Sequence, residues 1–128
     1  MGNAKAIKRP AVTAGFTPVV KKTAAYTIKN SESGTLFKWN SATGFNFTLP
    51  PVKKTAAGVF FDFAIELVPS SGSHGVAPNS ADKVFILSKT DGQAVTLDNT
   101  TDAVGDGFRL ISDGVDGWHL VAKVGTPA

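Results

Sequence analysis

A strict alternation of apolar and polar side chains over residues 45–49 is the feature that most restricts how this chain can fold. A period of two places Phe45, Phe47 and Leu49 on one face of an extended segment, which is the pattern of a β-strand with one buried face. Two prolines follow directly, and because proline has no N–H to donate to a neighbouring strand, they end the segment. Residues 45–49 therefore predict a short strand that covers a core.

The same alternation continues over residues 59–68, where five apolar side chains from Val59 to Leu67 share one face. A strand of this length is expected to be central in its sheet. Asp62 and Glu66 lie on the second face. That face is therefore expected to be partly exposed, or paired with lysines of a neighbouring strand or subunit.

Six further segments show strand periodicity between turn-forming residues, and no segment has the 3.6-residue period of a helix. Together they predict an all-β fold, a small β-sandwich or barrel of about eight antiparallel strands, with one domain over residues 23–128. The six segments are residues 26–29, 35–39, 83–88, 94–98, 108–112 and 118–124.

The last two segments predict a hairpin around a glycine-containing turn at residues 113–117. Residues 69–82 are rich in Ser, Gly and Pro and predict a long loop with no strand of its own, which is a candidate contact surface. His74 lies in this loop, His119 lies on the outward face of the last strand, facing solvent or a subunit contact, and neither is expected to be catalytic. The predicted inward side chains of the hairpin are Phe108, Leu110, Trp118, Leu120, Ala122 and Val124.

Residues 1–22 are small and basic and are interrupted by Pro10, Gly15 and Pro18, with neither the strand nor the helix period. They predict an extended N-terminal arm that a partner orders, because isolated apolar residues cannot form a core by themselves; the alternative is a flexible terminus with no such partner. Within and after the arm, the hexapeptide Val20–Ala25 recurs as Val52–Ala57, and each copy precedes a predicted strand. One reading is that both copies form a basic turn at the same rim; the other is a coincidence or a small local duplication, since six residues do not define a solenoid repeat.

Charge is divided unequally along the chain. Residues 1–54 contain nine basic residues and one acidic residue, a net charge of +8, whereas residues 55–128 contain four basic and nine acidic residues, a net charge of −5. Within one domain this division predicts a dipolar molecule suited to docking on a charged surface; the alternative is that the charges only keep two solvated faces soluble.

Several classes of chemistry are excluded or not expected. The chain has no cysteine, so disulfides, thiolate zinc sites and a cysteine nucleophile are excluded. No phosphate-binding loop, dinucleotide fingerprint or nucleophile elbow is present. The most apolar run, residues 56–68, contains two carboxylates and is shorter than the ~20 residues of a membrane span. We therefore expect no enzymatic activity, no cofactor and no membrane partner.

Two kinds of ligand, Ca²⁺ and single-stranded nucleic acid, are weaker alternatives. Five aspartates could supply oxygen ligands to Ca²⁺, but they match no EF-hand loop and Asp-Gly turns account for most of them, so no metal site is predicted. Basic residues interleave with four aromatic residues, a combination that single-strand-binding barrels use for base stacking. These aromatics also have the period of core residues, so we do not expect a nucleic-acid partner. The aspartates are Asp98, Asp102, Asp106, Asp113 and Asp116, and the aromatics are Phe37, Trp39, Phe45 and Phe47.

Five segments carry a resemblance to a known class of proteins: Tyr26–Ile28, Ser33–Phe37, Gly44–Pro50, Gly58–Phe61 and Ser112–Val121. Their order over residues 23–124 resembles the surface modules of bacteriophage virions, which occur in head decoration proteins and in tail-fibre or spike domains. The resemblance implies an all-β subunit, often trimeric, that contributes to a virion by packing. The chain has no long shaft or coiled-coil heptads, so it looks more like a capsid decoration or cement protein.

The resemblance implies that the chain is a homotrimer on the outer surface of the capsid, where it binds and stabilises the shell of the major capsid protein. The alternative is a receptor- or glycan-binding module of a tail fibre, in which the loop at residues 69–82 faces the host and Trp39 or Trp118 stacks on a sugar. For the first reading, the residues expected to contact the capsid are those of the basic arm, Lys5, Ile7, Lys8, Arg9, Val12, Phe16, Lys21 and Lys22.

Overall fold

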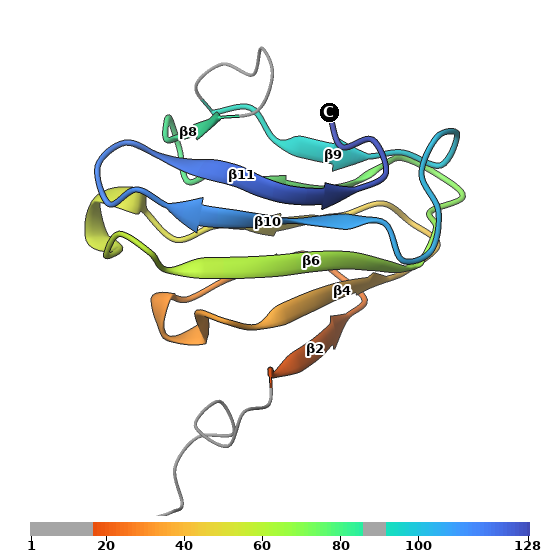
Figure 1. The fold of residues 1–128 in the computed structure, drawn as a ribbon. Coiled ribbons are helices and arrows are strands. Elements are labelled where there is room, and N and C mark those ends of the chain that lie inside the picture. Colours follow the sequence, from red (N-terminus) through yellow and green to blue (C-terminus); the bar gives the residue numbers. More distant parts are fainter. Residues whose placement is uncertain (1–16, 86–91) are drawn as a thin grey trace, which may run out of the picture.

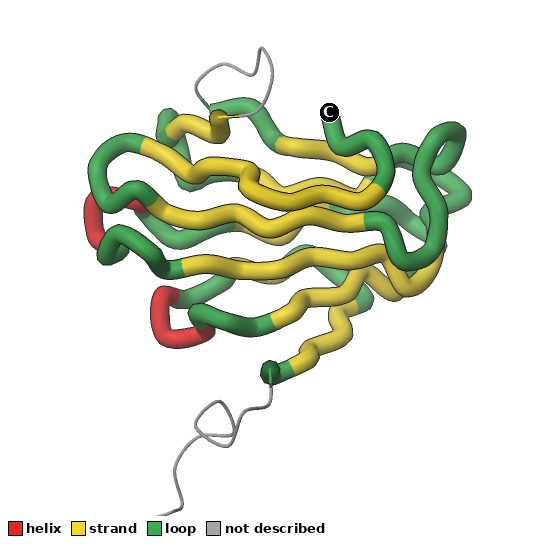
Figure 2. Tube along the Cα trace, in the orientation of Figure 1, coloured by secondary structure: helices red, strands yellow, loops and turns green. Residues whose placement is uncertain are grey.

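Two β-sheets pack face to face in the computed structural model, which describes residues 17–85 and 92–128 (Figure 1). The all-β prediction is confirmed, and the helical content of the described residues is limited to two short 3₁₀ turns, η2 (Asn30–Glu32) and η3 (Val52–Lys54), drawn red in Figure 2. The six-stranded sheet has the order β2 (Val19–Lys22), β4 (Leu36–Asn40), β6 (Phe60–Leu67), β10 (Gly107–Ser112), β11 (Gly117–Val124) and β8 (Lys83–Phe85). The four-stranded sheet has the order β3 (Tyr26–Thr27), β5 (Asn46–Thr48), β7 (His74–Ala77) and β9 (Val95–Leu97).

The chain crosses from one sheet to the other after every strand from β2 to β9, and only β10 is followed by a strand of its own sheet among the described residues. Strands that follow each other in a sheet are therefore separated by a strand in the opposite sheet, and they run parallel in β2–β4–β6 and in β3–β5–β7. The predicted antiparallel arrangement is wrong for these pairs, because their connections cross the core instead of forming hairpins. Both sheets are mixed, since β6–β10, β10–β11 and β7–β9 are antiparallel.

The eight predicted strands are all present among the described residues, and β6 is central as expected, between β4 and β10. The structure adds β2, which turns the end of the predicted arm into an edge strand parallel to β4. It also adds β7, so the prediction of a strand-free loop at residues 69–82 is wrong. His74 begins β7 and is fully buried, which contradicts its expected place in a mobile loop.

The hairpin of β10 and β11 is confirmed, but its predicted inward face is only partly correct. Opposite residues are Leu110 and Leu120, then Arg109 and Ala122, so Val121 is an extra residue in β11. Such a β-bulge reverses the faces that follow it. Ala122 and Val124 were predicted to point inward, but they lie on the same side as Arg109, away from the core.

Aromatic side chains fill the space between the sheets. The ring of Phe37 lies 5.3 Å from that of Phe47 and 6.0 Å from that of Phe63 between centroids, which joins the two sheets. Trp39 and Trp118 are also fully buried. Each fully buried large side chain contributes about 1.5–3 kcal/mol of transfer free energy, so this cluster is the main source of stability.

The repeated hexapeptide takes two different conformations. In the first copy Val20–Lys22 is part of strand β2, whereas in the second copy Val52–Lys54 forms the turn η3. The prediction of two equivalent turns is wrong. Pairing with β4 stabilises the extended form of the first copy, and the preceding prolines begin the turn of the second.

Candidate functional site

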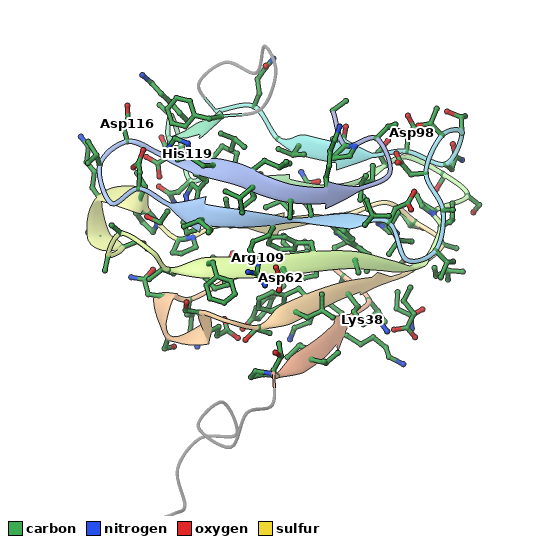
Figure 3. The ribbon with its side chains drawn as sticks, viewed as in Figure 1. Lys38, Asp62, Asp98, Arg109, Asp116 and His119 are labelled. Atoms are coloured by element: carbon green, nitrogen blue, oxygen red, sulfur yellow. The ribbon has the colours of Figure 1, made fainter. Side chains whose placement is uncertain are left out.

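The side of the six-stranded sheet that faces away from the four-stranded sheet, here called the outer face, combines apolar side chains with paired charges. Alternation in β6 places Phe60, Asp62, Ala64 and Glu66 on it, as expected from the sequence, and the strand register adds their neighbours. Figure 3 looks onto this face. The neighbours are Val19, Lys21, Leu36, Lys38, Gly107, Arg109, Ile111, His119, Ala122 and Val124.

Arg109 and Asp62 form a two-pronged ion pair at the centre of the outer face (Figure 3). Arg109 Nε donates to Asp62 Oδ1 at 2.6 Å, and Nη2 donates to Oδ2 at 2.9 Å. The guanidinium carbon lies 4.5 Å from the centre of the Phe60 ring. Hydrogen bonding to Asp62 raises the pKa of Arg109 above its usual value. The two-pronged ion pair and the contact with the Phe60 ring thus hold the guanidinium group in position on the face.

Glu66 holds a second group of charges on the same face. Its carboxylate lies 3.3 Å from Lys21 Nζ and 3.4 Å from Lys38 Nζ. Partial burial acts to raise the pKa of Glu66, but hydrogen bonds from the two lysines outweigh it and lower the pKa below its usual value. The predicted pairing of β6 carboxylates with lysines of neighbouring strands is confirmed for Glu66, while Asp62 takes an arginine.

Apolar side chains are exposed at both ends of the face. Val19 on β2 is 59% exposed, and Val124 on β11 is 62% exposed. The bulge in β11 turns Ala122 and Val124 outward, so this exposure follows from the hairpin geometry. An apolar sheet face whose carboxylates already have cationic partners is less costly to remove from water than one with unpaired charges.

His119 lies at the β8 end of the face. Its ring stacks on Phe85 at 4.5 Å between centroids, and Nε2 is 3.0 Å from Asp113 Oδ2. Burial acts to raise the pKa of Asp113, but backbone N–H groups of the turn and the His119 side chain hold it well below its usual value. His119 is exposed, as predicted from its place in the strand.

The aspartates considered as Ca²⁺ ligands have partners within the protein: Asp98, Asp106 and Asp113 accept hydrogen bonds from nearby residues of their turns, Asp102 accepts from the Thr126 N–H, and Asp116 pairs with Lys83. Asp98 accepts hydrogen bonds from the backbone N–H and hydroxyl groups of Thr100 and Thr101, led by the Thr101 N–H, and these lower its pKa to about 2. Asp113 accepts three backbone N–H groups of its own hairpin turn. Within residues 17–85 and 92–128 no group of three His, Asp or Glu side chains is placed to hold a metal ion.

The aromatic residues considered for ligand stacking belong to the core. Phe37, Trp39, Phe47 and Trp118 have no exposed surface. The expected stacking of Trp39 or Trp118 on a sugar is therefore contradicted. The same burial excludes Phe37, Trp39 and Phe47 as a platform for nucleic-acid bases, which requires accessible ring faces.

Two of the predicted capsid-contact residues lie in the described part of the chain, and both already interact within it. Lys21 pairs with Glu66, and Lys22 Nζ lies 3.9 Å from the centre of the Tyr26 ring. The other six lie outside the described residues: Lys5, Ile7, Lys8, Arg9, Val12 and Phe16.

The two-pronged ion pair between Arg109 and Asp62 was not predicted from the sequence. Both residues alternate with core residues of their strands, so the sequence shows that each lies on the outward face of its strand, but it does not show that β6 and β10 are neighbours.

None of the described residues forms a helix that is long and apolar enough to cross a membrane. No protein-family model matches the chain, and a search of curated proteins finds no match.

Proposed function

We propose that this chain is a structural protein of a bacteriophage virion, a capsid decoration protein that binds the major capsid protein on the outer surface of the shell. In this proposal the chain acts as a homotrimer and performs no catalysis. The observation that carries the proposal is the outer face, where exposed aliphatic side chains surround ion pairs that are already formed. Exposed apolar surface of this kind is typical of protein-binding sites.

The distribution of charge supports an anchoring role for the N-terminal segment. Residues 17–85 and 92–128 contain nine basic and nine acidic residues, so the excess of +3 in the chain comes from Lys5, Lys8 and Arg9. This segment joins the body at β2, the edge strand of the outer face. A basic segment attached beside an apolar face would engage an acidic shell at two adjacent places, and many copies would strengthen attachment further.

The test uses heads of the virus whose genome encodes this chain, prepared without the chain. Purified protein is added, and the heads are imaged by electron cryomicroscopy. We expect regular density over the whole head, and we expect a variant that lacks residues 1–16 to lose it while keeping its β circular dichroism spectrum. Absence of density, or density confined to the tail, would overturn the proposal.

A further inference from the structure

A depression of about 320 Å³ lies on the outer face, over β4, β6, β10 and β11. Three of its lining residues, Gly105, Gly107 and Ala122, have no large side chain. Gly107 cannot be replaced without distortion, since a Cβ atom there would overlap the carbonyl oxygen of Phe63. Ala122 faces the depression from the neighbouring strand, where the bulge has turned it outward. Leu36 and Val124 supply further apolar lining.

Arg109 contributes the polar part of the depression and has unused donors. A guanidinium group carries five N–H bonds, and Asp62 accepts one from Nε and one from Nη2. The second N–H of Nη2 and both N–H bonds of Nη1 have no acceptor among the residues that the structure describes. This free edge has the spacing of a second two-pronged contact, and the Arg109 side chain is 43% exposed.

The charges around the depression favour a single negative charge on the ligand. On the outer face its charged lining residues are Arg109 and Asp62, which neutralise each other. Lys123 also lines the depression, but the register sets it opposite the core residue Phe108, so it is not counted with the outer-face charges. A monoanion adds one negative charge beside this neutral pair, whereas a dianion such as phosphate would meet the carboxylate of Asp62 with twice the charge.

We propose that the depression binds the carboxylate of a glutamate or aspartate side chain of the partner protein. The carboxylate accepts from the free edge of Arg109, and the neighbouring aliphatic groups of the partner segment contact Leu36, Ala122 and Val124. A protruding side chain fits better than a free small molecule, because small-molecule sites enclose most of their ligand and this depression is open. Phe60 and Asp62 fix Arg109 beforehand, so little side-chain entropy is lost on binding. The identity of the partner as a capsid protein rests on the proposed function; the carboxylate site does not.

The test is a ¹H–¹⁵N NMR titration of the full chain with the peptide acetyl-Val-Glu-Val-amide and with its Gln analogue. We expect saturable shifts of the Arg109 Nε–H signal and of the backbone signals of Gly105, Gly107 and Ala122 with the Glu peptide. We expect the Gln peptide to bind at least about tenfold more weakly, since one charge-assisted hydrogen bond is worth that much. Equal responses to the two peptides, or shifts confined to other regions, would overturn the inference.

Substitutions separate this inference from the proposed function. Ala122→Phe fills the depression at an exposed position and should abolish the shifts, while Val115→Phe, at a position that is 68% exposed in the hairpin turn, should not. Peptide binding without head binding would support the site and overturn the capsid proposal. Head binding that Ala122→Phe leaves unchanged, together with no peptide response, would overturn the site and leave the capsid proposal standing.

Discussion

The imidazole ring of His74 lies almost parallel to the indole ring of Trp39, with 5.6 Å between their centroids and 8° between their planes. Both side chains are fully buried, one from each sheet. His74 Nε2 is 3.0 Å from the carbonyl oxygen of Leu67, and Nδ1 is 3.4 Å from the backbone nitrogen of Phe45. Donation from Nε2 and acceptance at Nδ1 satisfy both contacts with a neutral ring, so His74 links β7 to Leu67, the last residue of β6, and to Phe45 within the core.

The neutrality of His74 predicts a loss of stability in mild acid. Burial lowers the pKa of His74 below its usual value of 6.5. Above that pH the ring is neutral in both states and its full contribution is present. As the pH falls below it, the unfolded chain binds a proton that the folded chain does not, so the free energy of unfolding decreases, by at most about 1.4 kcal/mol per pH unit. Urea unfolding at several pH values between about 5 and 7.5 measures this decrease.

Two variants test whether His74 causes this loss of stability in acid. His74→Phe keeps an aromatic ring against Trp39 and removes the titrating group, so it should be less stable at neutral pH by about 1–3 kcal/mol and should show a smaller decrease in acid. His119→Gln removes the exposed histidine and should retain the decrease. A decrease that disappears with His119→Gln and persists with His74→Phe would contradict the assignment.

The ion pair of Arg109 and Asp62 predicts a measurable coupling energy. In a double-mutant cycle with Asp62→Ala and Arg109→Ala, unfolding free energies should show a coupling of about 0.5–1 kcal/mol, at the upper end for partly exposed pairs because the contact is two-pronged. The coupling should decrease in high salt. The pair Lys83 and Asp116, 3.4 Å apart and more exposed, is a matched control and should couple less. Equal coupling energies in the two cycles would show that the two-pronged contact of Arg109 with Asp62 gives no additional stability.

The close approach of β6 and β10 at Gly107 predicts an intolerant position. Gly107→Ala places a methyl group on the Phe63 carbonyl, so the strands must separate, and stability should fall by at least about 2 kcal/mol in thermal or urea unfolding. Ala122→Val adds volume at the exposed neighbour of Arg109 and should change stability by no more than about 0.5 kcal/mol. A tolerated Gly107→Ala would mean that the two strands lie farther apart than described.

The burial of both tryptophans predicts their fluorescence. The folded protein should emit at shorter wavelength than the unfolded chain, and acrylamide should quench it far less, because Trp39 and Trp118 are inaccessible. Neither an oligosaccharide nor a single-stranded oligonucleotide should alter the emission. Quenching of the folded protein to the extent seen for the unfolded chain would place a tryptophan at the surface.

Strand positions were predictable because they depend on a local period. All eight predicted strands exist, and the inward residues of β6 and the outward residues Asp62 and Glu66 follow from alternation alone. The parallel pairing was not predictable, since turn residues do not reveal whether a connection joins neighbours in a sheet or crosses the core. β7 escaped prediction because Gly75 leaves too few side chains to show a period, and β2 because its pattern is only four residues long.

The candidate site was harder to predict than the fold. Alternation without a bulge puts Ala122 in the core, and only the pairing of β10 with β11 shows that it lies beside Arg109 on the outer face. The predicted sites at the first sixteen residues lie outside the described part of the chain. Lys21 was correctly placed at the surface, but its bond to Glu66 depends on the alignment of three strands.

The repeated crossing between sheets also affects the order in which strands can pair while the chain is being synthesised. Val19 pairs with Leu36 and Tyr26 with Phe47, so the first strands can associate soon after they leave the ribosome, while Asp62 must wait for Arg109, 47 positions later. Until β10 is made, β6 has an unpaired edge with alternating apolar residues. A truncated product that ends before residue 107 would keep that edge open, and such fragments are expected to aggregate where the complete chain stays dispersed.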